Sequence, residues 1–364
     1  MNNKKLTILA VVALALVVWA VVQSRIISRP PTQDRKPQYL IQGLDPAEIA
    51  TIVLGKGDDT ITLKRLSGRF VIAEKDNYPA PNREINNAIT ACLDIQTAEL
   101  YTDDPKNHED LGVTEEKAQI VVKFYRADSS LLTGVIIGDT KQTGQGTYVR
   151  LLNSDEVYIA PETTWIDNRA VNYAGADLIS IKRADIESVT VTGPNDVYTL
   201  SRDPNSGIIT LQDMPHGKKL KDREHERLFA ALTSLRFEDV KKFSQQQQDL
   251  SFDRQFVCRL NDSTVYTLSI ARTDGKTYIT CSAEFTDPQP VMKERAVETE
   301  DELKKKEAKL LARDRAEDFS KKHTGWLYQI PEYKAKILTK DLSELLEDQT
   351  PPEEKAQELE AMET

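Results

Sequence analysis

Few residues in this sequence stand at the spacing that phosphate or dinucleotide binding requires. A phosphate-binding loop has the pattern GxxxxGK[ST], in which backbone amides surround the phosphate and the lysine neutralises its charge. Gly275-Lys276-Thr277 supplies only the end of this pattern, because Ile270 stands where its first glycine belongs. Gly144 and Gly146 begin a dinucleotide-binding pattern, but Val149 replaces its third glycine. We interpret both segments as turns.

Metal ligands and nucleophiles are equally sparse. The chain has four histidines, spread along its length: His108, His216, His225 and His323. His225-Glu226 lacks the second histidine of a zinc-binding HExxH helix. No GxSxG or SxxK motif provides a serine nucleophile. Paired acids such as Asp103-Asp104 could serve as a general acid and base, but we interpret them, with Asp110 near His108, as solvated loops. The sequence predicts no catalytic, cofactor-binding or metal-binding residues, no cofactor, and a protein that is not an enzyme.

Cysteine and aromatic residues are typical of a folded core. Cys258 and Cys281 each alternate with apolar neighbours on one face of an expected strand, and Cys92 lies on an expected helix. A Cys258–Cys281 disulfide stays open as an alternative. Several aromatic residues occupy strand edges or equivalent positions of two copies described below, and we interpret them as core, with a recognition surface as the alternative. They are Trp165, Trp326, Tyr148, Tyr158, Tyr278 and Tyr328.

Charge and length narrow the class of protein. The 364 residues carry 48 Lys and Arg against 58 Asp and Glu, a net charge of −10. With 29% charged residues, the chain is not a multi-span membrane protein. An acidic chain repels a phosphate backbone, so nucleic acid is not expected as a partner.

The N-terminal residues predict a membrane anchor. Leu6 to Val22 carries no charge and is apolar apart from Thr7. At 1.5 Å per residue this segment spans roughly 25 Å, near the lower limit for crossing a bilayer. Lys4 and Lys5 favour a cytoplasmic N-terminus. We therefore expect a single-pass protein of the inner (cytoplasmic) membrane at residues 1–29, with its bulk in the periplasm or outside. A cleaved signal peptide and a buried core helix remain the alternatives.

The rest of the chain predicts an internal repeat. After a polar linker at 30–43, a first copy at 44–170 can be aligned with a second at 171–347. Each copy offers an entry turn, strands, one helix, a further strand and a three-stranded meander. Asp274-Gly275 is a strong signal for a two-residue hairpin. The matched segments are Asp45–Val53 with Arg183–Val191, Thr60–Arg65 with Val197–Arg202, Ser67–Ile72 with Ser206–Thr210, Gly146–Val149 with Lys276–Ile279, and Val157–Pro161 with Leu327–Pro331.

We predict helices and strands in these copies at definite positions. The helices are expected at 82–97, 221–235 and 332–347. The strands that follow the first two helices are expected at 98–101 and 237–241. The meander strands are expected at 120–124, 131–137, 147–152, 255–260, 265–271 and 276–283.

The second copy contains a charged insertion at about 287–323. Within it, Thr299–Lys322 is predicted to be a helix, because Thr299 and Glu302 have the spacing of a capping box. A solvated helix lying on the sheet and a protruding arm that docks a partner are both open. The acidic segment 348–364 is expected to be a disordered tail. The predicted fold class is α+β, a tandem repeat of mostly antiparallel sheets, each with one helix packed on a face, preceded by a transmembrane helix.

Several short motifs make the chain similar to a known bacterial family. Those motifs are Leu44-Asp45-Pro46, Leu111-Gly112-Val113, Ile136-Ile137-Gly138, Thr147-Tyr148-Val149-Arg150 and the closing Trp326–Ala335 segment. In the order of its elements the chain resembles proteins of the domain of unknown function family 4340. Such proteins are often encoded beside gliding-motility-type ABC transporter subunits. The family has no established catalytic residues to transfer.

The resemblance implies an accessory role in the cell envelope. We expect a non-enzymatic, membrane-anchored subunit or adaptor of an ABC-type export system, whose partner is the transporter permease or its extracytoplasmic domain. The alternative is an envelope scaffold or ligand-binding module independent of a transporter. The sequence identifies no small-molecule ligand.

Overall fold

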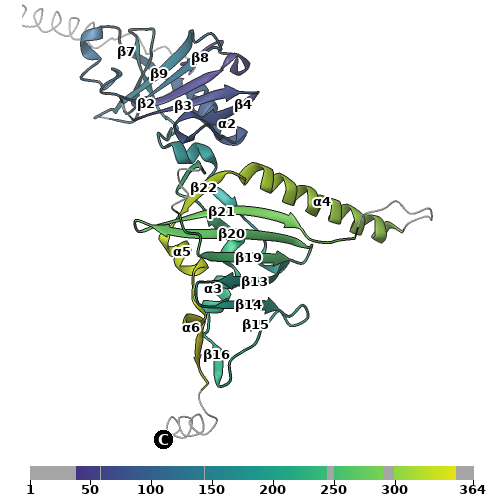
Figure 1. Ribbon diagram of the computed structural model, residues 1–364. Coiled ribbons are helices and arrows are strands. Elements are labelled where there is room, and N and C mark those ends of the chain that lie inside the picture. Colours follow the sequence, from purple (N-terminus) through teal and green to yellow (C-terminus); the bar gives the residue numbers. More distant parts are fainter. Residues whose placement is uncertain (1–37, 58, 143, 244–249, 290–298, 350–364) are drawn as a thin grey trace, which may run out of the picture. The chain divides into compact units, whose positions relative to one another are not determined.

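The computed structural model describes residues 38–349, apart from 58, 143, 244–249 and 290–298 (Figure 1). The chain divides into two compact units, Met1–Thr60 with Asn86–Asn168 and Ile61–Ile85 with Arg169–Thr364. The predicted anchor, Leu6–Val22, and the tail beyond Gln349 lie outside the described residues. Within the described ranges, no helix combines the length and the apolar character needed to cross a bilayer.

A mostly antiparallel nine-stranded sheet has the order β5-β4-β3-β2-β8-β9-β10-β11-β7. In β2, Thr51–Lys56, half-buried and buried side chains alternate from Thr51 to Leu54. A small ladder joins Gln38–Tyr39 (β1) to Gln96–Thr97 (β6). The strands of the sheet are β2 (Thr51–Lys56), β3 (Asp59–Leu66), β4 (Arg69–Ile72), β5 (Tyr78–Pro79), β7 (Glu99–Thr102), β8 (Ile120–Tyr125), β9 (Leu131–Thr140), β10 (Thr147–Leu151) and β11 (Val157–Ala160).

An eight-stranded antiparallel sheet follows in the second unit, in the order β15-β14-β13-β19-β20-β21-β22-β18. Two small ladders accompany it, one joining β12 to β17 and one joining β16 to β23. These strands are β12 (Asp177–Ile179), β13 (Ile186–Thr192), β14 (Val197–Arg202), β15 (Ile209–Leu211), β16 (Lys218–Leu220), β17 (Leu235–Arg236), β18 (Asp239–Lys242), β19 (Arg254–Leu260), β20 (Thr264–Thr273), β21 (Lys276–Phe285), β22 (Trp326–Ile330) and β23 (Leu346–Asp348).

The helices are few, and the fold is therefore α+β with mostly antiparallel sheets, as predicted. The longest is α4, which lies along β21 in Figure 1. The α-helices are α2 (Asn82–Leu93), α3 (Glu224–Phe229), α4 (Glu300–His323), α5 (Glu332–Leu338) and α6 (Leu342–Leu345). The 3-10 helices are η1 (Pro46–Glu48), η2 (Ala73–Lys75), η3 (Pro105–Asn107), η4 (Ala170–Ala174), η5 (Arg183–Asp185) and η6 (Ala231–Ser234).

The predicted meander strands and the charged helix are confirmed. Asp274 and Gly275 form the turn between β20 and β21 with φ values of 51° and 72°, the left-handed region that such turns need. Thr299 caps α4, and the reciprocal hydrogen bonds of a capping box join it to Glu302. The strand expected at 237–241 lies at Asp239–Lys242.

The three other predicted helices are shorter than expected because tertiary contacts compete for their ends. The first ends at Leu93, since residues 96–97 pair with β1. The second is α3, which starts late because Arg223 has φ 68°, outside the helical region. It then gives way to η6, where the Lys334 ammonium donates to the Ala231 carbonyl. The helix propensity of a segment carries no information about these partners, because they are distant in the sequence.

The last predicted helix is divided into α5 and α6 and then becomes a strand. Arg254 donates to the carbonyl of Thr339 at 2.8 Å, which holds the chain where α5 ends. Asp341 then begins α6 with its own capping box. Residues 346–348 pair with β16, so Asp348, the expected first residue of the tail, is part of a strand.

The open question of a Cys258–Cys281 disulfide is answered by the sheet. Cys258 lies on β19 and Cys281 on β21, with β20 between them. Two strand spacings amount to roughly 9–10 Å, beyond the reach of a disulfide. Both thiols are free and buried, as is that of Cys92. Burial raises the pKa of each of the three to about 12.

Two glycines let a loop approach the nine-stranded sheet closely. A Cβ on Gly138 would lie 2.5 Å from the Leu111 carbonyl oxygen and 2.6 Å from a methyl group of Val113. Gly112 has φ 63°, and the amide of Asp139 donates to the Leu111 carbonyl at 3.0 Å. Two of the sequence motifs, 111–113 and 136–138, thus meet at one backbone contact.

We therefore expect Gly138→Ala to lower the free energy of unfolding by about 2–3 kcal/mol, because the added methyl overpacks a core that includes Leu111 and Val113. Urea unfolding followed by circular dichroism measures the change. Gly43→Ala is the control, since its Cβ meets nothing within 4 Å although its φ is 74°. A loss at Gly138 no larger than at Gly43 would contradict the overpacking argument.

Candidate functional site

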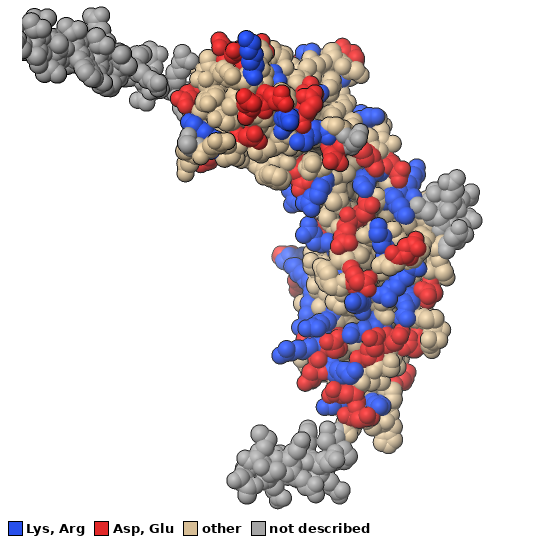
Figure 2. Space-filling view, turned by 90° about the vertical axis from the view of Figure 1, so that its left-hand side faces the viewer, with Lys and Arg blue, Asp and Glu red and all other residues tan. Residues whose placement is uncertain are grey.

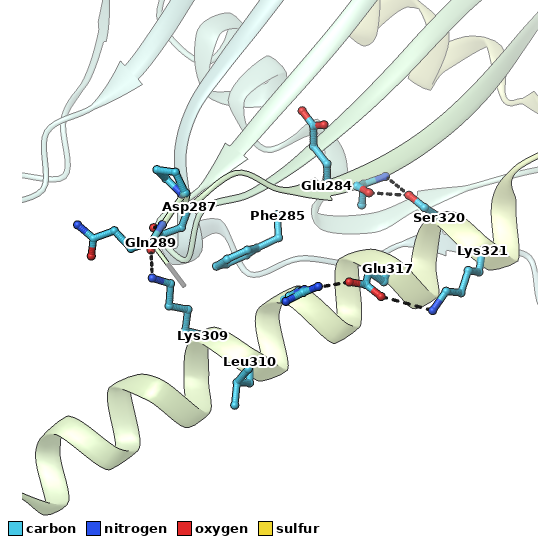
Figure 3. A pocket seen from close by; sticks show the side chains of 12 residues that line it. Glu284, Phe285, Asp287, Gln289, Lys309, Leu310, Glu317, Ser320 and Lys321 are labelled. Carbon is cyan, nitrogen blue, oxygen red and sulfur yellow. Dashed lines mark hydrogen bonds and ion pairs between the residues drawn. The ribbon is translucent and has the colours of Figure 1, made fainter. Parts of the chain in front are cut away.

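A groove of the second unit lies between α4 and the edge of β21 (Figure 3). It encloses about 780 Å³. One wall is the end of β21 and the loop that follows it, and the other is the middle of α4. The residues that form it include Phe285, Asp287, Lys309, Leu310, Arg313 and Glu317.

Small side chains bring α4 close to the sheet. Only Ala312, Ala316 and His323 are buried among the helix residues described. Phe319 packs edge-on against Tyr266 of β20, with ring centres 5.1 Å apart. Because α4 presents few apolar side chains to the sheet, its position depends on a few specific polar contacts.

Two of those contacts close the groove at its ends. The hydroxyl of Ser320 donates to the Ala283 carbonyl at 2.5 Å and accepts from the Ala283 amide at 2.8 Å. At the other end, the Lys309 ammonium lies 2.7 Å from the Asp287 carboxylate. Figure 3 shows the ring of Phe285 between these two points, facing the helix.

The acids beside the groove are held in their ionised form. The Lys309 hydrogen bond lowers the pKa of Asp287, and the Arg313 hydrogen bond lowers that of Glu317, with Lys321 adding to the effect. An ionised carboxylate cannot act as a general acid. The hydroxyl of Ser320 is engaged by the backbone on both its donor and acceptor sides. The groove is therefore equipped for binding, through apolar contact and backbone hydrogen bonds.

A second polar cluster is buried where α4 ends. His323 Nδ1 lies 2.6 Å from the hydroxyl oxygen of Tyr328, which lies 3.4 Å from that of Tyr78. Burial, followed by the nearby charge of Lys322, lowers the pKa of His323 to about 3. Burial likewise raises the pKa of Tyr328 and of Tyr78. The imidazole is thus neutral at pH 7 and shares a hydrogen bond with the Tyr328 hydroxyl.

The remaining histidines and paired acids have structural partners or face solvent. The ring of His108 lies 2.9 Å from the Asp155 carbonyl, and that of His225 lies 2.7 Å from the Lys221 carbonyl. His216 is exposed. Asp104 accepts from the Lys106 amide at the start of η3. Among the described residues, no three His, Cys, Asp or Glu side chains are grouped to hold a metal ion.

The aromatic residues named above divide between core and surface. Tyr148 and Tyr328 are buried, Trp326, Tyr158 and Tyr278 are half-buried, and Trp165 is 80% exposed. Figure 2 shows Lys and Arg interspersed with Asp and Glu on the face it presents. A mixed surface of this kind produces no strong potential of one sign.

The groove residues carry no motif that a sequence search would find. The capping box identified the helix, but its placement depends on the pairing of Ser320 with Ala283, 37 residues apart. The sequence offers one signal for this region, the large number of residues between the expected strands that correspond to β21 and β22. That separation indicated an insertion without indicating where it packs.

The comparisons with known proteins agree with the resemblance found in the sequence. The family with the description Domain of unknown function (DUF4340) matches residues 71–255, which is 185 of the 364 residues. No curated protein and no solved structure matches the chain. The match covers just over half of the sequence and includes most of the motifs on which the resemblance depended. This chain belongs to the DUF4340 family.

Proposed function

We propose that the chain is a non-enzymatic accessory subunit or adaptor of an ABC-type export system. Leu6–Val22 would hold it in the cytoplasmic membrane, and the two units would act on the extracytoplasmic side. The proposal combines the apolar N-terminal segment with the resemblance to envelope proteins encoded beside such transporters. Its partner would be the permease or the permease's extracytoplasmic domain.

The observation that carries this proposal is the exposed first half of α4. Leu303, Leu310 and Leu311 are 53%, 44% and 53% exposed, although the helix is capped and braced by ion pairs such as Glu300–Lys304. A stable helix that offers leucines to solvent is typical of a surface that binds another protein. The protruding-arm interpretation of the insertion is therefore the one we favour.

Replacing Leu303 and Leu310 by lysine tests the arm. The two residues are seven apart and share one helix face, so the double variant should lower the recovery of a permease and its ATPase several-fold without unfolding the chain. The measurement is purification from native membranes in mild detergent, with mass spectrometry of the associated proteins. The double variant Asp301→Lys with Glu307→Lys adds positive charge on α4 and keeps the leucines. Equal recovery for wild type and the leucine variant would remove the arm from the proposal.

The membrane orientation can be tested with the same chain. Its cysteines at 92, 258 and 281 are buried with raised pKa values, so they provide little background labelling. A cysteine introduced at the exposed position Glu307 should react in intact cells with a maleimide that enters the periplasm but not the cytoplasm. Labelling only after the cytoplasmic membrane is broken would contradict the proposed location.

We further propose that the two sheets arose by internal duplication. Apart from the short β5, the two sheets have the same strand order when the strands of each sheet are numbered along the chain. The orders are β4-β3-β2-β8-β9-β10-β11-β7 and β15-β14-β13-β19-β20-β21-β22-β18. A 3-10 turn precedes the corresponding strands β2 and β13. An experimental structure in which these strands do not superpose in pairs would contradict the duplication.

The second candidate is an envelope scaffold or ligand-binding module without a transporter. The exposed Trp165 favours it, because solvent-facing tryptophans are common at recognition sites. Recovery of the chain alone from native membranes, with its anchor intact, would shift support to this candidate.

A further inference from the structure

We propose that the groove beside α4 binds an extended segment of a partner polypeptide by adding it to the free edge of β21. This inference deepens the proposed adaptor role and depends on that role only for the source of the segment. Some backbone groups along the β21 edge have hydrogen-bond partners and others do not, and all of these residues belong to the second unit.

The β21 edge is only partly covered. Strand β22 pairs with β21 at Thr277, Tyr278 and Ile279 and no further along the described chain. Beyond that point α4 takes the place of a strand, because Ser320 satisfies both the amide and the carbonyl of Ala283. In Figure 1, β22 and α4 follow one another along this side of β21.

The alternation of the ladder determines where the next backbone groups point. In an antiparallel strand, the N–H and C=O of one residue point to the same side, and those of its neighbour point to the other. The Thr286 amide donates to the Ser263 carbonyl, on the β20 side. Ala283 faces α4. Phe285 is two residues after Ala283 and next to Thr286. Its N–H and C=O therefore point to the same side as those of Ala283, into the groove.

The dimensions of the groove suit a short strand. From Ala283 to Asp287 the edge advances about 13 Å at 3.3 Å per residue. On the facing wall, α4 advances about 16 Å from Lys309 to Ser320 at 1.5 Å per residue. The Ser320 contact and the Lys309–Asp287 ion pair close the two ends. About four extended residues fit between these limits.

The chemistry of the walls favours an extended backbone over a charged ligand. Most acids and bases that line the groove are paired with one another, as in Arg313–Glu317–Lys321 and Lys309–Asp287, while the exposed Glu284 has no ion pair among the described residues. Among the described residues, the groove-facing N–H and C=O of Phe285 have no partner, and its ring and Leu310 provide apolar surface. Strand addition next to a helix uses main-chain hydrogen bonds for affinity and one or two side-chain pockets for selectivity. The occupant is therefore an uncharged, strand-forming segment with an apolar side chain toward Phe285.

Two variants of one residue separate the backbone from the side chain. Phe285→Ala and Phe285→Pro both remove the ring, but only proline also removes the groove-facing N–H. Proline is tolerated where the amide of an edge strand points outward, so the variant should fold. The probe is a synthetic peptide selected from a displayed random-sequence library against the purified full chain in detergent. We expect Phe285→Pro to bind it at least tenfold more weakly than Phe285→Ala.

A second measurement tests the strand pairing through the probe and applies even if Phe285→Pro does not fold. N-methylation of single residues of the probe should abolish binding at the one position whose N–H donates to the Phe285 carbonyl and leave its two neighbours unaffected, because Ser320 already occupies the backbone of Ala283. Failure to select any peptide, equal affinity for the two variants, or a helical bound peptide without this single sensitive position would each overturn the proposal. A single sensitive position together with no permease recovered from membranes would leave strand addition standing and contradict only the transporter role.

Discussion

Arg150→Ala should lower the free energy of unfolding by about 3–4 kcal/mol, the largest effect we expect for a single substitution in the nine-stranded sheet. The guanidinium of Arg150 donates to four backbone carbonyls. Its Nε and Nη2 reach Val113 at 3.1 and 3.0 Å, and Nη1 reaches Ser154 at 2.8 Å, Leu152 at 3.4 Å and Leu151 at 3.3 Å. Alanine would remove this donor from all four carbonyls in a partly buried place, and only that of Leu151 has a second donor, the Ser154 amide at 3.2 Å, among the described residues.

The hydrogen bonds also explain why this position is an arginine. A planar guanidinium can reach several carbonyls at once, whereas a lysine ammonium acts from one point. Burial lowers the pKa of Arg150, which shows that its charge has lost part of its hydration. Arg150→Lys should therefore recover less than half of the lost stability.

Urea unfolding of the three forms measures the prediction. Arg126→Ala is the matched control, because Arg126 pairs with Glu48 at the surface, with both side chains about half exposed, and should cost less than about 1 kcal/mol. If Arg150→Ala and Arg126→Ala lose similar stability, the carbonyl contacts of Arg150 are not what holds the loop at Val113.

Acidification from pH 7 to pH 5 should lower the stability of the wild-type chain by about 2 kcal/mol through His323 alone. The pKa of this histidine is about 3 in the folded chain, against an ordinary value of 6.5 when unfolded. The unfolded chain therefore binds more protons throughout this interval. The stabilisation is complete above pH 6.5 and declines as the pH falls toward 3.

The physical cause is the burial of a neutral imidazole. His323 is 3% exposed and lies between Phe319, with ring centres 4.4 Å apart, and the hydroxyl of Tyr328. Protonation would place a charge in this buried site. Lys322, the next residue along the helix, adds a like charge that disfavours it further.

Unfolding free energies measured at pH 7 and pH 5 test this. His323→Gln keeps an acceptor for Tyr328 but cannot be protonated, so its pH dependence should be about 2 kcal/mol smaller than that of wild type. His216→Gln removes an exposed histidine and should leave the pH dependence unchanged. An identical slope in all three chains would show that His323 does not titrate as proposed.

Local elements that carry their own signals could be predicted from the sequence. The Asp274-Gly275 turn, the alternating strands around it and the capped start of α4 all form where the pattern predicts, because each depends on residues adjacent along the chain. The motifs at 111–113 and 136–138 also identified the family. The reason for their glycines became visible only where the two segments touch.

Tertiary structure decided the ends of the other helices and the site. Residues 96–97 and 346–347, expected at the ends of helices, pair with β1 and β16 instead, since strand partners distant in sequence outweigh weak helical propensity. The groove likewise exists because Ser320 completes the edge of β21 at Ala283. Neither residue type is distinctive, and a hydrogen bond between distant residues leaves no periodic pattern in a sequence. That is why the helix could be predicted and its binding groove could not.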